Sequence, residues 1–249
     1  FLYEGVEAKQ VGDSLVATIY AYDAEGNTVK GSQAAPYSAK VYCTSMFNKT
    51  ATQLGLSDAK YANMRTLLVD LLNYSSEAQK YFGYKEDTLV NADLSAELQV
   101  LASSDSVLSS LEDLTSVAYE VIENPTVTWK GATLMLMNKV YVRVNIQYAG
   151  DVNNIKAVFA LESGETYEVT EFVEYGDGLY YAYCDQVTAY QMETPIYVKI
   201  MEGNTVISNT VRYSVSSYAY KYQNNETVGA VVCAMMKYGK AAVAFMQAD

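Results

Sequence analysis

One five-residue segment occurs twice in this chain. Residues 25–29 read Glu-Gly-Asn-Thr-Val, and the same letters recur at 202–206, 177 positions later. Three shorter matches share this spacing or one residue less: Leu2-Tyr3 with Leu179-Tyr180, Ile19-Tyr20 with Ile196-Tyr197, and Tyr37-Ser38 with Tyr213-Ser214. Self-similarity of this kind indicates repeated supersecondary units. We therefore predict that the chain contains two copies of one unit.

Within each copy the hydrophobic period changes at the shared Tyr-Ser pair. Before it, apolar and longer amphipathic residues alternate, as in Ile196–Ile200, and Glu-Gly-Asn is typical of a hairpin turn. After it, Ser38 and Ser214 are typical helix N-caps. Apolar residues then recur at three- and four-residue steps over 58–82 and 226–246, which predicts two long helices with this stripe in the core.

The second copy carries a set of short strands that the first copy lacks. The predicted strands are Thr126–Trp129, Ala132–Met137, Lys139–Tyr148, Ile155–Leu161, Glu168–Val173 and Leu179–Asp185. Short strands at this spacing indicate an antiparallel sandwich. Because Phe1 aligns with Gly178, the first copy is predicted to begin after its leading strands. We expect its remaining strands to dock on the second sandwich or on the helices, because an isolated sheet remnant is marginal in water.

The predicted fold is therefore α+β, an antiparallel β-sandwich with helical hairpins in an internally repeated arrangement. Residues 1–84 form a truncated first repeat, 85–124 a bridging segment rich in Ser, Asp, Glu and Leu, and 125–249 the second repeat. The absence of an uncharged apolar run of about 18 residues predicts no membrane insertion. The opening residues, Phe1-Leu2-Tyr3-Glu4, suggest the middle of a strand, and so a processed fragment.

Charge and composition exclude several classes of function. A net charge of −12, without a basic stripe, disfavours nucleic acid as a partner. With no histidine, no Ser-His or Cys-His pair can form, and no phosphate-binding glycine loop is present. We predict no enzyme activity, no cofactor and no metal site. Two carboxylates could still hydrolyse a glycoside, but the five glutamates suit the exposed face of a hairpin: Glu162, Glu165, Glu168, Glu171 and Glu174.

Two smaller motifs have alternative interpretations. Asp23, Glu25 and Asn27 resemble calcium-loop ligands, but Gly26 and the repeat favour a hairpin turn. The three cysteines, at 43, 184 and 233, have no metal or redox spacing, which leaves one disulfide or three free thiols.

The end of the first long helix carries a recognisable signature. Residues 71–84 read Leu-Leu-Asn-Tyr-Ser-Ser-Glu-Ala-Gln-Lys-Tyr-Phe-Gly-Tyr after a β-rich stretch. This resembles a repeat module of large secreted and wall-attached proteins of gut-dwelling Gram-positive anaerobes, some of which carry dockerins or starch-adherence and other carbohydrate-binding modules. Residues 238–245, Tyr-Gly-Lys-Ala-Ala-Val-Ala-Phe, depart from the signature and suggest a terminal unit. The resemblance implies an extracellular, cell-surface location and no particular functional residues.

Exposed aromatic side chains are the candidates for ligand binding. Of 24 tyrosines, those that recur in both copies, such as Tyr20 and Tyr197, are predicted to be structural. Tyr181 and Tyr190 stand opposite carboxylates in the first copy, and Trp129 lies beside a Lys-Gly turn, so these three rings are predicted to be exposed. We expect an adhesion module that binds a polysaccharide, with starch or plant glycan as the leading ligand. The alternative is a structural spacer whose tyrosines meet neighbouring surface modules.

Overall fold

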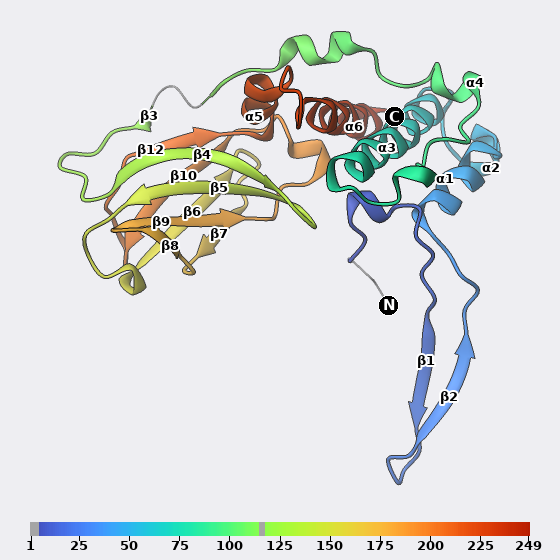
Figure 1. The fold of residues 1–249 in the computed structure, drawn as a ribbon, viewed down its shortest axis with the longest axis horizontal. Helices are drawn as coiled ribbons and strands as arrows, with labels where there is room; N and C mark the ends of the chain where they lie inside the picture. The colour runs from blue at the N-terminus through green and yellow to red at the C-terminus, as the bar shows by residue number, and fades with distance from the viewer. Residues whose placement is uncertain (1–4, 115–117) are drawn as a thin grey trace. The chain divides into compact units, whose positions relative to one another are not determined.

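The computed structural model describes residues 5–114 and 118–249 (Figure 1). Tyr3, which recurs as Tyr180 and is therefore predicted to be structural, lies outside these residues. The chain divides into two compact units, one of residues 1–103 with 247–249 and one of residues 104–246. Helices and antiparallel sheets occur together, which confirms the α+β class. The division falls inside the predicted bridging segment, 85–124.

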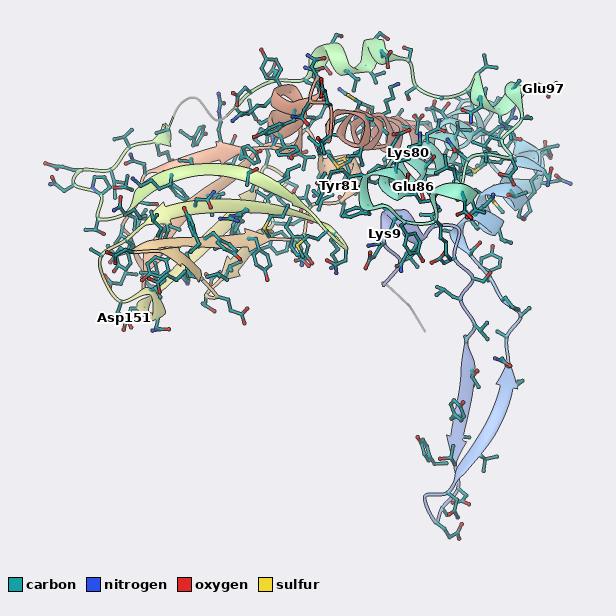
Figure 2. All side chains as sticks on the ribbon, in the orientation of Figure 1. Lys9, Lys80, Tyr81, Glu86, Glu97 and Asp151 are labelled. Atoms are coloured by element: carbon teal, nitrogen blue, oxygen red, sulfur yellow. The ribbon has the colours of Figure 1, made fainter. Side chains whose placement is uncertain are left out.

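The first unit is mostly helical apart from one hairpin. Its elements are η1 (Ala8–Gln10), β1 (Thr18–Tyr22), β2 (Thr28–Gln33), α1 (Ala39–Phe47), α2 (Ala51–Leu54), α3 (Asp58–Phe82), η2 (Glu86–Thr88) and α4 (Ala96–Gln99). Both η1 and α1 pack against α3. Lys9 of η1 lies with its ammonium 4.7 Å from the centre of the Phe82 ring at the end of α3 (Figure 2).

Helix α3 has the predicted bounds because both of its ends are capped. The Ser57 hydroxyl accepts a hydrogen bond from the Lys60 N–H at 3.1 Å. At the other end Gly83 adopts φ 61°, a left-handed conformation that lets its N–H reach the last carbonyls. The middle of the predicted stripe is buried, with Leu68 6% and Leu72 1% exposed, whereas Tyr81 near its end is 37% exposed. The caps thus confirm the bounds of the helix, and burial confirms the stripe in part.

The hairpin corrects two predictions for the first unit. Strands β1 and β2 form a two-stranded sheet, and Asp23 closes the turn by accepting a 2.7 Å hydrogen bond from the Asn27 N–H. Tyr20 was expected in the core but is 55% exposed, and within the first unit the hairpin does not pack on the helices. Its other large apolar side chains are also mostly exposed: Ile19 59%, Tyr22 70% and Val29 52%. The physical reason is that no third strand pairs with the hairpin among the described residues.

The second unit contains two antiparallel sheets. One has the order β3-β12-β10-β6-β7, with β11 also paired to β10, and the other has the order β4-β5-β9-β8. Their strands are β3 (Ala118–Glu120), β4 (Thr128–Leu136), β5 (Val140–Gln147), β6 (Ile155–Leu161), β7 (Thr166–Val169), β8 (Val173–Gly176), β9 (Leu179–Cys184), β10 (Ile196–Glu202), β11 (Thr205–Val206) and β12 (Thr210–Tyr213). The predicted strand Glu168–Val173 is wrong, because β7 and β8 end up in different sheets.

Alternation gives each sheet one buried face. Along β5, Val142, Val144 and Ile146 are fully buried, whereas the residues between them are not. Along β10, Ile196 and Val198 are buried in the same way. The remaining elements are η3 (Asp105–Ser110), η4 (Val152–Asn154), η5 (Ala189–Gln191), α5 (Val215–Tyr222) and α6 (Gly229–Gln247). Asp151, labelled in Figure 2, begins η4 by accepting a hydrogen bond from the Asn153 N–H at 3.0 Å.

Helix α6 bears on the prediction of no membrane insertion. Within the described ranges it is the one helix long and apolar enough to cross a membrane by length and composition, and 44% of its most apolar window is buried. Core helices of globular proteins meet the same criteria. Met235 and Met236 are fully buried, and Lys237 forms an ion pair of 2.7 Å with Asp105. The absence of membrane insertion stays a prediction.

Candidate functional site

Four tyrosines and one arginine gather on the outer face of the four-stranded sheet. Because β5 and β9 alternate, burial of Val142 and Val144 on one side leaves Tyr141 and Arg143 on the other. In the ladder Arg143 stands opposite Tyr183, and Asn145 stands opposite Tyr181. Tyr175 of β8 completes the group. We call Tyr141, Arg143, Tyr175, Tyr181 and Tyr183 the tyrosine face.

The rings of the tyrosine face contact one another in a row. The Tyr141 and Tyr183 rings are 5.1 Å apart and perpendicular, and Tyr181 lies 6.4 Å from Tyr183 and 6.0 Å from Tyr175. Tyr175 is 45% exposed and Tyr183 38%, whereas the other two are half-buried. The row therefore offers solvent two apolar ring surfaces with polar hydroxyl tips.

Arg143 fixes the centre of this row. Its guanidinium carbon lies 3.8 Å from the ring centre of Tyr181 and 5.2 Å from that of Tyr175. Its Nε donates a 2.8 Å hydrogen bond to Asn145 Oδ1, which sets the plane of the group. Within the described part of the chain its terminal nitrogens have no protein partner, so they can donate to a ligand.

The three predicted binding residues do not come together. Tyr181 belongs to the tyrosine face, but Arg143 covers one side of its ring. Trp129 is half-buried, its Nε1–H donates a 2.8 Å hydrogen bond to the Asn209 carbonyl, and it lines a cavity of about 220 Å³. Tyr190 is 45% exposed on η5 and has no ring contact with the tyrosine face.

Sequence reasoning missed Tyr141, Arg143, Tyr175 and Tyr183. A signal for Tyr183 was present, because it lies two residues after Tyr181 and residues at this spacing share a face of a strand. The Asp177-Gly178 turn between β8 and β9 also predicted that these strands are neighbours, but no such signal connects β5 to β9. Their neighbourhood depends on pairing and register, which one strand's sequence does not specify.

A second concave surface lies on the six-stranded sheet. Its groove of about 420 Å³ is lined by Tyr119, Glu120, Val158, Ala160, Leu161, Glu162, Tyr197, Lys199 and Thr210. The Tyr119 and Tyr197 rings are 4.5 Å apart, so the half-buried Tyr197 is held by a neighbour rather than by the core. Burial raises the pKa of Tyr197. The tyrosine face has the larger set of ring contacts and is therefore the candidate site.

Other chemical groups in the chain show no built reaction centre in the described residues. All five glutamates considered above for glycoside hydrolysis are exposed. Glu168 forms an ion pair with Lys156 at 2.7 Å, and Glu165 accepts hydrogen bonds from Ser163 and Gln191. No cluster of three potential metal ligands occurs in residues 5–114 or 118–249. The cysteines resolve the alternative left open by the sequence, since all three are free.

Comparison with known proteins adds no relative. No protein-family model, no curated protein and no solved structure matches this chain.

Proposed function

We propose that this chain is a non-catalytic, extracellular module of a bacterial surface protein and that its tyrosine face binds polysaccharide. The observation that carries the proposal is the pair of exposed rings, Tyr175 and Tyr183, beside the guanidinium of Arg143 on the outer face of the four-stranded sheet. Ring faces pack against the C–H faces of sugars, and Arg143 with Asn145 can bond hydroxyls. The location is supported by the resemblance of residues 71–84 to surface-protein repeats.

The expected affinity for one polysaccharide chain is modest. An aromatic contact contributes about 0.5–1.5 kcal/mol beyond area burial, and the face offers two exposed rings. Costs of ordering the ligand reduce this further. We therefore expect a Kd on the order of 0.1–1 mM, which becomes useful when several modules bind the same polymer.

We further propose that the two sheets form a β-sandwich and that the unit is repeated. Two short 3-10 helices support the repeat, because in each a glutamine side chain accepts from the backbone N–H three residues earlier: Gln10 from Glu7 and Gln191 from Thr188. Next along the chain, the Lys40 N–H bonds the Val11 carbonyl, just as the Ser216 N–H bonds the Met192 carbonyl. Ser38 and Ser214 then cap α1 and α5 in the same way.

The alternative function is a spacer or assembly unit without a small ligand. The exposed apolar side chains of the β1–β2 hairpin favour it, because contiguous exposed apolar surface marks protein interfaces. In this alternative the tyrosine face also contacts a neighbouring module. The two functions predict different results for the isolated chain. A polysaccharide-binding module should be retained on polysaccharide by itself, whereas a spacer should not.

The test is retention of the 249-residue chain on insoluble starch, xylan and cellulose, followed by a glycan array. Tyr175→Ala, Tyr183→Ala and the double variant are compared with Tyr220→Ala. Tyr220 is the matched control, since it is a 50% exposed tyrosine of the same unit on α5. Circular dichroism checks that all variants are folded.

The proposal expects retention to fall at least about tenfold in the double variant, equivalent to 1.4 kcal/mol, and to be unchanged in Tyr220→Ala. Equal retention of all variants would place the binding site elsewhere. Absence of binding to every polysaccharide and arrayed glycan would favour the spacer.

A further inference from the structure

The β1–β2 hairpin has a free backbone edge. In the second unit, β10 is paired on both sides, by β12 and β11 on one side and by β6 on the other. Strand β1 is paired on one side alone among the described residues, by β2. Figure 1 shows no third strand beside this hairpin. Its outer edge therefore presents unpaired N–H and C=O groups.

The two hairpins lead into their helices through the same ladder position. Leu15 and Tyr37 exchange two backbone hydrogen bonds, of 2.7 and 2.9 Å, and Tyr37 precedes the N-cap Ser38. In the second unit Ile196 pairs with Tyr213, which precedes the N-cap Ser214. By pairing, Leu15 thus takes the place of Ile196. This corrects the ungapped match of Ile19 with Ile196, because the first hairpin has the longer loop.

Equivalent residues differ sharply in burial. Ile196 is 1% exposed and Tyr213 is 3% exposed, whereas Leu15 and Tyr37 are 42% and 50% exposed. The residues on the helix side of the same junction do not differ in this way, since Val11 is 5% and Met192 is 7% exposed. The difference in exposed fraction therefore lies on the hairpin side of the junction. In the second unit, this is the side that pairs with β6 and its neighbouring strands.

We propose that the free edge of β1 receives a strand in the position of β6, supplied by another β-sheet unit with the fold of residues 125–186 joined in series. This inference rests on the repeat proposed above and not on glycan binding. The added strand would pair antiparallel with β1, as Ile155–Leu161 pairs with β10. Its sheets would cover Leu15 and Tyr37.

A second copy of this chain does not fit the edge equally well. Its β6 is already paired on both sides, by β10 and by β7. Providing that strand to another molecule would unpair it from its own sheet. The suitable occupant is a β-sheet unit that lacks a hairpin of its own, which is what residues 125–186 become when they are separated from residues 187–213.

The experiment is a chimera in which a copy of residues 125–186 is joined directly to Val6 of the full chain, in place of residues 1–5. Backbone amide exchange of Thr18–Tyr22 is compared in the chimera and in the 249-residue chain. A second chimera carries Val158→Pro in the added copy, which breaks the strand that should pair with β1. Size-exclusion chromatography reports whether the chains are monomers.

We expect exchange of the β1 amides to slow by at least about tenfold in the first chimera and to remain fast in the second, with both chains monomeric. Unchanged exchange beside a folded added unit would overturn the proposal. An added unit that stays unfolded would overturn it equally, because the hairpin should complete that unit. Protection of β1 in the 249-residue chain at high concentration, together with dimer formation, would assign the edge to a second copy instead. None of these outcomes depends on polysaccharide binding.

Discussion

The guanidinium carbon of Arg143 lies 3.8 Å from the centre of the Tyr181 ring, so one of the two inner rings of the tyrosine face is covered by a cation. This stacking holds both side chains in place. It also leaves the flanking rings, Tyr175 and Tyr183, as the ones that a ligand can reach.

Replacing Arg143 should weaken polysaccharide binding without unfolding the chain. Arg143→Gln removes the cation–π contact and should lower the free energy of unfolding by about 0.5–1 kcal/mol, as measured by urea denaturation. Arg143→Lys should not restore retention, because an ammonium lacks the planar donor fork. Arg212→Gln, on a different sheet, is the control. Retention of Arg143→Gln equal to that of the wild-type chain would remove this residue from the site.

Binding at the tyrosine face should also survive raised ionic strength. Ring stacking is apolar, whereas attraction between exposed charges is screened within about 8–10 Å at 0.1–0.15 M salt. Retention on polysaccharide should therefore be similar at low salt and at 0.5 M sodium chloride. A steep loss with salt would indicate that charged groups, rather than the rings, supply the binding.

Truncation of the α3 core should destabilise the first unit. Leu68 is 6% exposed, so Leu68→Ala leaves a cavity and should cost about 2–5 kcal/mol. Val100→Ala is the matched control, because this aliphatic side chain is 78% exposed and its loss should change stability within about 0.5 kcal/mol. Thermal midpoints that are equal for the two variants would mean that the buried face of α3 is assigned wrongly.

The thiols should differ in reactivity although all three are free. Burial raises the pKa of the Cys43 thiol to about 11, and it also raises the pKa of Cys184. Few of these groups are thiolate at pH 8, and reagent cannot reach them. Burial also raises the pKa of Cys233, but this thiol is half-buried and accessible, so it alone should react, slowly, with an aromatic disulfide reagent in the native chain, and all three should react in denaturant. A native chain that consumes three equivalents rapidly would contradict the described packing.

Local signals in the sequence predicted the helices well. Helix α3 matches its expected range because Ser57, Gly83 and the apolar stripe each act within a few residues. The hairpin shows where such signals fail. Residues 25–29 and 202–206 are identical, yet Thr28 pairs with Tyr22 across a five-residue loop, whereas Thr205 pairs with Glu202 across two residues. The register of a hairpin depends on the strands that pair and pack with it, and these come from distant parts of the sequence.

The candidate site could be predicted only in part for the same reason. The sequence identified Tyr181 because it stands opposite a carboxylate in the first copy. Its partners lie on β5 and β8 and become its neighbours through strand pairing. The inference that recurring tyrosines are buried failed at Tyr20, because recurrence of a residue does not guarantee recurrence of the strands that cover it. Burial of Tyr213 and exposure of Tyr37 illustrate this at an equivalent position.

These two tyrosines supply a direct comparison within one chain. Tyr213→Ala should lower the free energy of unfolding by at least about 3 kcal/mol, because a 3% exposed ring leaves a large cavity. Tyr37→Ala should change it by less than about 1 kcal/mol, since half of that ring is already in water. In the chimera with an added β-sheet unit, the cost of Tyr37→Ala should rise toward that of Tyr213→Ala. Equal costs in the unmodified chain would contradict the difference in burial.

The contact between η1 and the end of α3 should make the first unit sensitive to acid. Asp13 accepts hydrogen bonds from the Tyr84 hydroxyl at 2.5 Å and from the Lys85 ammonium at 2.7 Å. Burial acts to raise the pKa of Asp13, but the hydrogen bonds from Lys85 and Tyr84 outweigh it and hold the pKa below its ordinary value of 3.8. Because the folded pKa is depressed, the stabilisation is present above the unfolded pKa of about 3.9 and is lost as pH falls through the folded value.

Asp13→Asn should therefore cost about 1 kcal/mol at pH 7, a figure already reduced for solvent screening of this partly exposed pair. The difference between the wild-type chain and Asp13→Asn should be constant from pH 7 to about pH 5, shrink below about pH 4, and vanish once Asp13 is protonated in both states. Urea denaturation at a series of pH values measures this difference in the free energy of unfolding.

Asp23→Asn is the matched control. The Asp23 carboxylate also has a lowered pKa, from hydrogen bonds with Asn27, but it lies in the exposed hairpin turn. Its removal should leave the unfolding of the helical part unchanged. A cost of Asp13→Asn that persists unchanged at pH 3 would show that shape, and not the charge, of the Asp13 side chain holds η1 to α3.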